Sequence, residues 1–245
     1  MNATGTDDAN RAYYDAFSKG YEDQRGANAP DGYHELLDEL ETGFVRRYGR
    51  GANILEVGCG TGLVMRRISE FARSTQGVDI SPGMLEKART RGLNVQEGSA
   101  TKLPFEDNSF DLTCSFKVLA HVPEIGTALS EMARVTRRGG IVLAEFYNPH
   151  SLRGLVKRFG RAGAISDEKN ESDVYTRFDS PAEIERIMPS NCELVDARGV
   201  RIFVPTAHTM NLPVVRSIFR WAERKSCDSR LSRFGGFYIA AMRKL

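Results

Sequence analysis

The sequence predicts an α/β protein with a mostly parallel sheet and helices on both faces of that sheet. Three observations support this prediction. Short apolar segments alternate with helical periodicities over residues 49–147, a glycine-rich turn follows the first apolar segment, and two more strand-like segments lie near the C-terminus. Strands that alternate with helices favour parallel pairing, because each crossover helix then covers a face of the sheet. The 245 residues suffice for one such domain with a modest addition.

The first fifty residues are predicted to be helical. Tyr14, Phe17 and Tyr21 are spaced at i, i+3 and i+7, which places them on one helix face. A second stripe of the same kind contains Tyr33, Leu37, Leu40, Phe44 and Tyr48. We therefore expect a helical cap over residues 1–48.

The region from residue 49 to residue 147 is predicted to form the core of the sheet. Its expected strands are residues 53–57, 74–79, 93–98, 110–116 and 141–146. The first of them, residues 53–57, is a short apolar run that leads into glycines, as strands buried in a parallel sheet do.

The helices between these strands are predicted from periodicity and from their ends. The first carries Val64, Ile68 and Phe71 on one face. The second begins at Ser81-Pro82, an N-cap followed by proline at the first helical position, and runs to about Arg91. The third is expected to stop at Gly139–Gly140. Its apolar face consists of Ile125, Ala128, Leu129, Met132 and Val135.

Residues 148–245 are predicted to add lid segments and the last two strands of the same domain. A capping box over residues 180–183 begins a short helix, residues 213–225 form another, and the strands are expected at 193–204 and 237–242. Within residues 152–161 an apolar stripe faces four basic residues. This pattern describes either an ordinary lid helix or a weakly attached membrane-surface helix, and we expect at most weak, salt-sensitive membrane contact.

Composition and charge narrow the classes of protein. Apolar residues make up 41% and charged residues 27%, as in ordinary globular proteins. Without a secretory signal or an apolar run near the roughly 20 residues that span a bilayer, we expect a soluble, cytoplasmic protein. Four scattered cysteines predict reduced thiols, with no metal site. The net charge of +2 divides into −4 for residues 1–150 and +6 for residues 151–245, which favours a solvated basic surface.

One motif indicates a ligand site. Glu56-Val-Gly58-Cys59-Gly60-Thr-Gly62 lies between the first strand and its helix, where glycines let a ligand approach the backbone. A glycine trio alone also describes a tight structural turn. However, Asp79 follows Gly58 by 21 residues at the end of the next strand, where a carboxylate accepts hydrogen bonds from both hydroxyls of a ribose. Because Ser81 already caps the following helix, Asp79 is left for a ligand.

These segments resemble the successive motifs of class I S-adenosylmethionine-dependent methyltransferases. The matching segments are ILEVGCGTG, VDISPGML, GSATKLPFEDNSFDLTCSFKVLAHV and EMARVTRRGGIVLAEF, in order from about residue 50 to residue 147. They are especially similar to the ubiquinone/menaquinone-biosynthesis type and to related small-molecule enzymes. The resemblance implies S-adenosylmethionine as cofactor and a Rossmann-like, seven-stranded sheet whose last strand is antiparallel.

The resemblance also implies roles for individual residues. Gly58, Gly60 and Gly62, with Cys59 between the first two, would lie against the methionine and ribose portions of the cofactor, and Asp79 would bind the ribose. Ile80 and Met84 would line the adenine pocket, where Ser99-Ala100 stands in place of the aspartate that the family usually has. Glu56 would lie near the cofactor's ammonium, to which Phe116 would offer its backbone carbonyl. Tyr14 and Tyr21 match tyrosines that close over the cofactor in some relatives, or they are core residues of a helix stripe.

The expected chemistry is methylation of an O, N or C atom of a small molecule. The sulfonium makes the methyl group electrophilic, so the protein must align a nucleophile in a dry pocket. His121, after the fourth strand, is the candidate general base or else a structural histidine. Lys117, Tyr147 and His208 are weaker candidates.

Two other classes of function stay open. The chain is alternatively a catalytically silent S-adenosylmethionine-binding partner or regulatory protein, although its glycine loop is intact. A nicotinamide dehydrogenase would carry GxGxxG, which is absent. We expect no nucleic-acid partner, because no aromatic and basic recognition motif is present. Nothing in the pattern specifies an oligomeric state.

Overall fold

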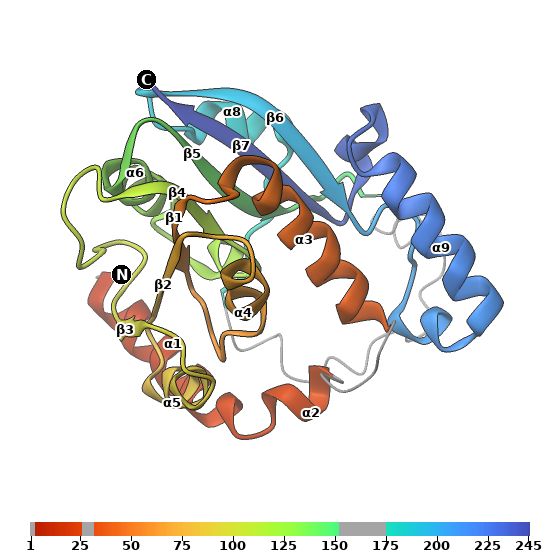
Figure 1. The fold of residues 1–245 in the computed structure, drawn as a ribbon, viewed down its shortest axis with the longest axis horizontal. Helices are drawn as coiled ribbons and strands as arrows, with labels where there is room; N and C mark the ends of the chain where they lie inside the picture. The colour runs from red at the N-terminus through yellow and green to blue at the C-terminus, as the bar shows by residue number, and fades with distance from the viewer. Residues whose placement is uncertain (1–2, 26–31, 152–174) are drawn as a thin grey trace.

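Seven strands form one sheet in the order β3-β2-β1-β4-β5-β7-β6 (Figure 1). The structure is a computed structural model that describes residues 3–25, 32–151 and 175–245. The strands are β1 (Asn53–Val57), β2 (Ser74–Asp79), β3 (Val95–Glu97), β4 (Phe110–Ser115), β5 (Thr136–Tyr147), β6 (Cys192–Val200) and β7 (Phe237–Lys244). Strands β1 to β5 pair in parallel, and β7 runs antiparallel to both β5 and β6. The predicted Rossmann-like sheet with an antiparallel last strand is therefore confirmed.

Helices cover both faces of this sheet. They are α1 (Ala3–Ser18), α2 (Tyr21–Arg25), α3 (Tyr33–Gly49), α4 (Leu63–Ser69), α5 (Pro82–Thr90), α6 (Ile125–Val135), α8 (Pro181–Ile187) and α9 (Pro213–Ser226), with short 3-10 turns η1 (Leu119–His121), η3 (Ala207–Asn211) and η4 (Arg230–Phe234). One core cluster joins α3 and α4 to one face of the sheet, and a second joins α6 and α8 to the other.

The predicted helix stripes pack where their periodicity indicates. Leu36, Leu37, Leu40 and Phe44 of α3 are fully buried in the first cluster, because residues spaced by three and four share one face of a helix. The start of α5 also agrees with the sequence, since the Ser81 hydroxyl accepts a hydrogen bond from the Met84 N–H at 3.2 Å. Local sequence signals therefore define these elements.

Several boundaries differ from the prediction, and four of the differences concern α1, α4, α6 and β6. The helix expected to stop at Gly139–Gly140 ends at Val135, because the extended residue Thr136 already pairs with Phe110 and begins β5. Residues 139–140 lie inside β5, where its register against β4 shifts. Helix α1 ends at Ser18, so Tyr21 belongs to α2 and does not share one helix with Tyr14.

The other two differences concern Phe71 and the sixth strand. Phe71 lies beyond the end of α4, although it joins the first core cluster. Strand β6 ends at Val200 instead of residue 204, since the buried Glu223 carboxylate accepts hydrogen bonds from the N–H groups of residues 202–204 at 2.7–3.2 Å. Those donors are therefore bound by a side chain and not by a neighbouring strand.

Two sequence predictions concern contact with membranes. Within the described ranges, no helix has the length and apolar character needed to cross a bilayer. The amphipathic stripe expected over residues 152–161 lies outside the described residues.

Candidate active site

A cavity of about 430 Å³ opens at the carboxyl ends of the parallel strands. Strand β1 is the point at which the strand order reverses. The chain adds β2 and β3 on one side of β1, and then adds β4 and β5 on the other side. Open α/β sheets bind their ligands at such a reversal of strand order. The predicted site residues that line it are Tyr14, Tyr21, Glu56, Gly58, Cys59, Gly60, Asp79, Ile80, Met84, Ser99, Ala100, Phe116 and His121.

The glycine turn forms one wall of the cavity. The Gly58 and Cys59 N–H groups donate to the Val78 carbonyl at 2.7 and 3.0 Å, which ties the turn to β2. At Gly60, where φ is +53°, an added Cβ would meet no atom within 4 Å, so the space above this residue is open. Gly62 does not line the cavity. It caps the N-terminus of α4 at φ +80°, with Leu93 packed where its Cβ would stand.

Asp79 connects the turn to the next strand. Its Oδ2 accepts a hydrogen bond from the Gly60 N–H at 2.8 Å, and its Oδ1 accepts one from the Ser81 N–H at 2.9 Å. Burial raises the pKa of Asp79, and these backbone donors act in the opposite direction. Because a carboxylate has about four lone-pair positions, two remain for hydroxyl groups of a ligand.

The part of the cavity wall that follows β2 and β3 is less polar. Ile80, Met84 and Ala100 line it together with Ser99. The Ser99 hydroxyl lies 2.8 Å from the Thr101 hydroxyl and accepts from the Thr101 N–H at 3.2 Å. These contacts hold the serine in place, so it offers the cavity an uncharged oxygen.

Aromatic side chains of α1 and α2 cover the cavity. Tyr14 and Tyr21 line it and are absent from the buried core clusters. Tyr13 and Phe17 join them, with rings in contact at centroid distances of 5.2 Å for Tyr13–Tyr14 and 5.5 Å for Phe17–Tyr21. Tyr13 was not among the residues predicted for the site. Its spacing of one residue from Tyr14 and four residues from Phe17 was the signal that could have indicated it.

His121 lies at the edge of the same cavity, on η1. Its Nδ1 is 3.0 Å from the Tyr175 carbonyl oxygen, which only accepts hydrogen bonds, so Nδ1 carries the proton. The other ring nitrogen, Nε2, is then a lone-pair acceptor in the neutral imidazole. Burial lowers the pKa of His121 below its usual value, which favours this neutral form. The Tyr14 and Tyr147 rings lie 6.3 and 5.8 Å from the imidazole.

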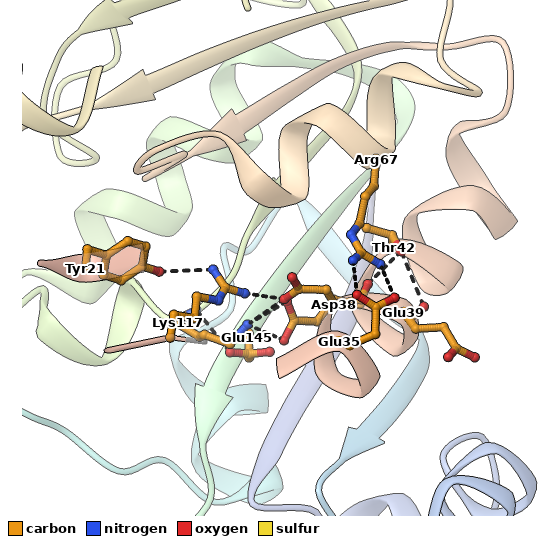
Figure 2. Close-up of polar contacts among 10 residues, drawn as sticks. Tyr21, Glu35, Asp38, Glu39, Thr42, Arg67, Lys117 and Glu145 are labelled. Atoms are coloured by element: carbon orange, nitrogen blue, oxygen red, sulfur yellow. Dashed lines mark hydrogen bonds and ion pairs between the residues drawn. The ribbon is translucent and has the colours of Figure 1, made fainter. Parts of the chain in front are cut away.

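A cluster of buried charges borders the cavity, and its members Arg25 and Lys117 line the cavity wall. Figure 2 shows the polar contacts of this cluster. Lys117 Nζ contacts both carboxylate oxygens of the fully buried Glu41, at 2.5 and 2.7 Å, and lies 3.8 Å from Asp38. Arg25 bonds Asp38 on its other side and donates to the Tyr21 hydroxyl at 3.1 Å. The ammonium of Lys117 is thus held in ion pairs, and the chain of contacts extends from Lys117 to a tyrosine of the cavity.

The backbone at Lys117 is also fixed by this cluster. Lys117 adopts a φ of +60°, which is uncommon for a residue with a side chain, and its N–H donates to Glu145 Oε1 at 3.0 Å. Burial raises the pKa of Glu145 to about 8. Glu145 therefore shapes the loop after β4, which carries Phe116 and His121.

Glu56 is a buried carboxylate directed at the ligand space. Among the described residues no hydrogen-bond partner is found for its Oε2. Burial, and after it the neighbouring Glu41 carboxylate, raises the pKa of Glu56 well above its usual value. A buried charge without a partner is costly, so a cationic ligand group would stabilise the ionised form. The carboxylates, open glycine turn and apolar end together fit S-adenosylmethionine, which carries an ammonium, a sulfonium, a ribose and an adenine.

Of the two remaining candidates for catalysis, Tyr147 and His208, one lies at the cavity and the other does not. Tyr147 lines the cavity, whereas His208 is exposed on η3 and does not. Asn10 and Thr176 line it without having been predicted. The Asn10 amide donates to the His121 carbonyl at 3.1 Å, a contact across 111 positions that no local signal indicates.

Comparison with known proteins agrees with the expected family and cofactor. The methyltransferase domain family matches residues 55–144. The chain is 40% identical over 131 residues to a demethylmenaquinone methyltransferase of Renibacterium salmoninarum, covering 48% of this chain and 55% of the relative. It is 32% identical over 183 residues to one of Staphylococcus aureus, covering 66% and 76%. The chain thus spans about half the length of the curated relatives that it matches first.

A solved structure shows the same fold over nearly the whole chain. It is a SAM-dependent methyltransferase of Thermotoga maritima, with 22% identity and a TM-score of 0.66, and the match covers 96% of this chain and 99% of that one.

Proposed function

Given that the chain belongs to the class I S-adenosylmethionine-dependent methyltransferases, we propose that it transfers a methyl group from this cofactor to an O, N or C atom of a small molecule. The observation that carries the proposal is the cavity itself. There the open space over Gly60, the lone pairs of Asp79 and a Glu56 oxygen that has no hydrogen-bond partner among the described residues face one ligand volume.

The proposal assigns the cofactor's parts to the walls of the cavity. Asp79 accepts hydrogen bonds from the ribose hydroxyls, and Glu56 with the Phe116 carbonyl binds the ammonium. Gly58, Cys59 and Gly60 contact the ligand directly, while Gly62 sets the start of α4. Ile80, Met84, Ser99 and Ala100 hold the adenine, and Tyr14 and Tyr21 cover the site.

His121 is the proposed general base for an acceptor with an O–H or N–H group. S-adenosylmethionine supplies a methyl group that is already electrophilic, so the chain's residues position the acceptor and remove its proton. The acceptor proton passes to His121 Nε2, while Nδ1–H remains bonded to the Tyr175 carbonyl. This carbonyl stabilises the imidazolium that forms.

The acceptor in this proposal is a small molecule with a planar ring, such as a quinone-like compound. Tyr14, Tyr147 and His121 present ring faces and edges to the cavity, and such surfaces pack well against a flat ring. The relatives of Renibacterium salmoninarum and Staphylococcus aureus, which are named for demethylmenaquinone, support this class of acceptor. We propose that the protein acts in the cytoplasm and does not bind nucleic acid.

The chain organisation follows from the same proposal. Residues 49–147 bind the cofactor, residues 1–48 cap it, and residues 148–245 contribute lid segments and the last strands. Hydrogen exchange with and without S-adenosylhomocysteine tests this division. Added protection should reach residues 1–48 and 148–234, and protection confined to residues 50–120 would contradict a lid.

Binding and turnover are tested separately. Calorimetry with S-adenosylmethionine, S-adenosylhomocysteine and NAD should show binding of the first two only. Turnover with a labelled methyl donor and a panel of hydroxylated aromatic and quinol acceptors should then release S-adenosylhomocysteine. Binding without turnover on a pool of cellular metabolites would favour the alternative, a catalytically silent partner protein. Binding of NAD alone would overturn the cofactor assignment.

A further inference from the structure

Helix α9 exposes an apolar face that no described residue covers. Val214, Ile218 and Trp221 are 73%, 59% and 64% exposed. Their spacing of four and three residues places them in one row along the helix. Leu212, just before the helix, is 60% exposed as well. The opposite side of α9 packs inward through the partly buried Phe219 and the fully buried Glu223.

The position of α9 leaves this row accessible. The helix lies at the periphery of the molecule, beyond α3 as seen from β1 (Figure 1). Arg220 and Arg224 both bond Glu39 of α3, at 2.7–2.8 Å, and so fix the orientation of the helix. The apolar row is therefore presented outward by a helix that is held in place.

Basic residues lie along one side of the apolar row. Helix α9 carries Arg216, Arg220, Arg224 and Lys225, and its one acidic residue, Glu223, is buried. Arg224 is exposed beside the row and Lys225 within it, whereas the Arg220 side chain is only 13% exposed and Arg216 lies on the opposite side of the helix. A helix with a tryptophan and aliphatic residues on one face and arginines and lysines beside it is typical of helices that lie in a membrane interface.

We propose that the exposed face of α9 docks reversibly on an anionic lipid surface, with Trp221, Ile218 and Val214 entering the headgroup region. Anionic headgroups complement the exposed Lys225 within the row and Arg224 beside it. A second copy of this chain is the less favourable occupant, because a two-fold contact through this row would bring two basic flanks together. The proposal does not depend on methyl transfer.

The chain provides its own probe, since Trp221 is its only tryptophan. Its fluorescence should move to shorter wavelength on titration with vesicles of equimolar phosphatidylcholine and phosphatidylglycerol, and high salt should reverse the shift. Phosphatidylcholine vesicles alone should give a much smaller response. Co-sedimentation with the same vesicles measures binding independently of the fluorescence.

Two variants on α9 and one control elsewhere test the surface itself. Ile218→Asp keeps the tryptophan and should weaken vesicle binding about tenfold or more, the expected effect of losing one buried aliphatic side chain. Lys225→Gln should weaken it about fivefold, and only for anionic vesicles. Thr127→Asp adds the same charge at an exposed position of α6 and should bind like the parent protein. Unchanged melting temperatures and cofactor affinity of all three verify that they are folded.

Several results would overturn the proposal. They are no fluorescence shift with anionic vesicles, equal binding to both vesicle types, or equal loss of binding in Thr127→Asp and Ile218→Asp. A short-wavelength emission already present without vesicles would show that another part of this chain, or a second copy, covers the face. Dependence of that emission on protein concentration would identify the second copy.

Discussion

Alanine substitutions at three glycines distinguish the effect of backbone strain from the effect of blocking a ligand. Two of these glycines lie in the turn after β1, and the third is a control elsewhere. Gly60, Gly62 and Gly92 have φ values of +53°, +80° and +73°. Alanine in this region costs about 1–2 kcal/mol, so each Gly→Ala change carries that loss in the free energy of unfolding. At Gly60 and Gly92 the new Cβ meets no atom within 4 Å, so no further loss is expected there.

Gly62→Ala should cost more, because the new Cβ would stand 2.2 Å from Leu93 Cδ1 and 3.3 Å from Ala88 Cβ. Overpacking of this kind adds about 1–3 kcal/mol, for a total of about 2–5 kcal/mol. In a chain of this size each kcal/mol lowers the melting temperature by roughly 2–4 °C. Gly62→Ala should therefore melt roughly 4–20 °C below the parent protein, and the other two variants roughly 2–8 °C below it.

Calorimetry with S-adenosylmethionine supplies the second measurement. Gly60→Ala should lose most of its affinity, because its methyl group projects into the ligand space, whereas Gly92→Ala, outside the cavity, should bind like the parent protein. Equal binding by these two variants would refute the assignment of Gly60 to the ligand wall. If Gly62→Ala is no less stable than Gly92→Ala, the packing argument for Gly62 fails.

Three further predictions concern titratable groups. Asp79→Asn keeps an acceptor oxygen but loses the charge that holds two hydroxyls, so calorimetry should show weaker binding of S-adenosylmethionine, and undiminished binding would remove the ribose assignment. His121→Gln should lower kcat by about 10²–10⁴-fold with cofactor affinity retained. Because burial lowers the pKa of His121, the rate of the parent enzyme should fall only below about pH 6.5, and an acidic limb above that value would contradict the role. Glu145 has a pKa raised to about 8 in the folded protein, so its contribution to stability is present at low pH and is lost as pH rises toward 8. In urea unfolding, the free energy of unfolding of Glu145→Gln should therefore rise relative to that of the parent protein between about pH 5 and 8. A difference in this free energy that stays constant with pH would exclude this titration.

Much of the fold was predictable because its signals are local. The bounds of β1, residues 53–57, agree with the prediction, since a short apolar run that leads into a glycine turn defines such a strand. The bounds of β2, residues 74–79, agree as well. The Ser81-Pro82 start of α5 agrees for the same reason. At residues 136–140 the local signal fails, because pairing of Thr136 with Phe110 overrides the expected helix stop at the glycines.

By itself the sequence determined the fold class, the cofactor motif and the residues at the strand ends, because backbone geometry and apolar periodicity act over a few neighbouring residues. Only the tertiary structure decided which groups meet across the chain. The Tyr175 carbonyl that sets the proton on His121 lies 54 positions away, and Glu41, which binds Lys117, lies 76 positions away. The tertiary structure also shows that Trp221 is exposed, because the burial of a side chain depends on elements from distant parts of the chain.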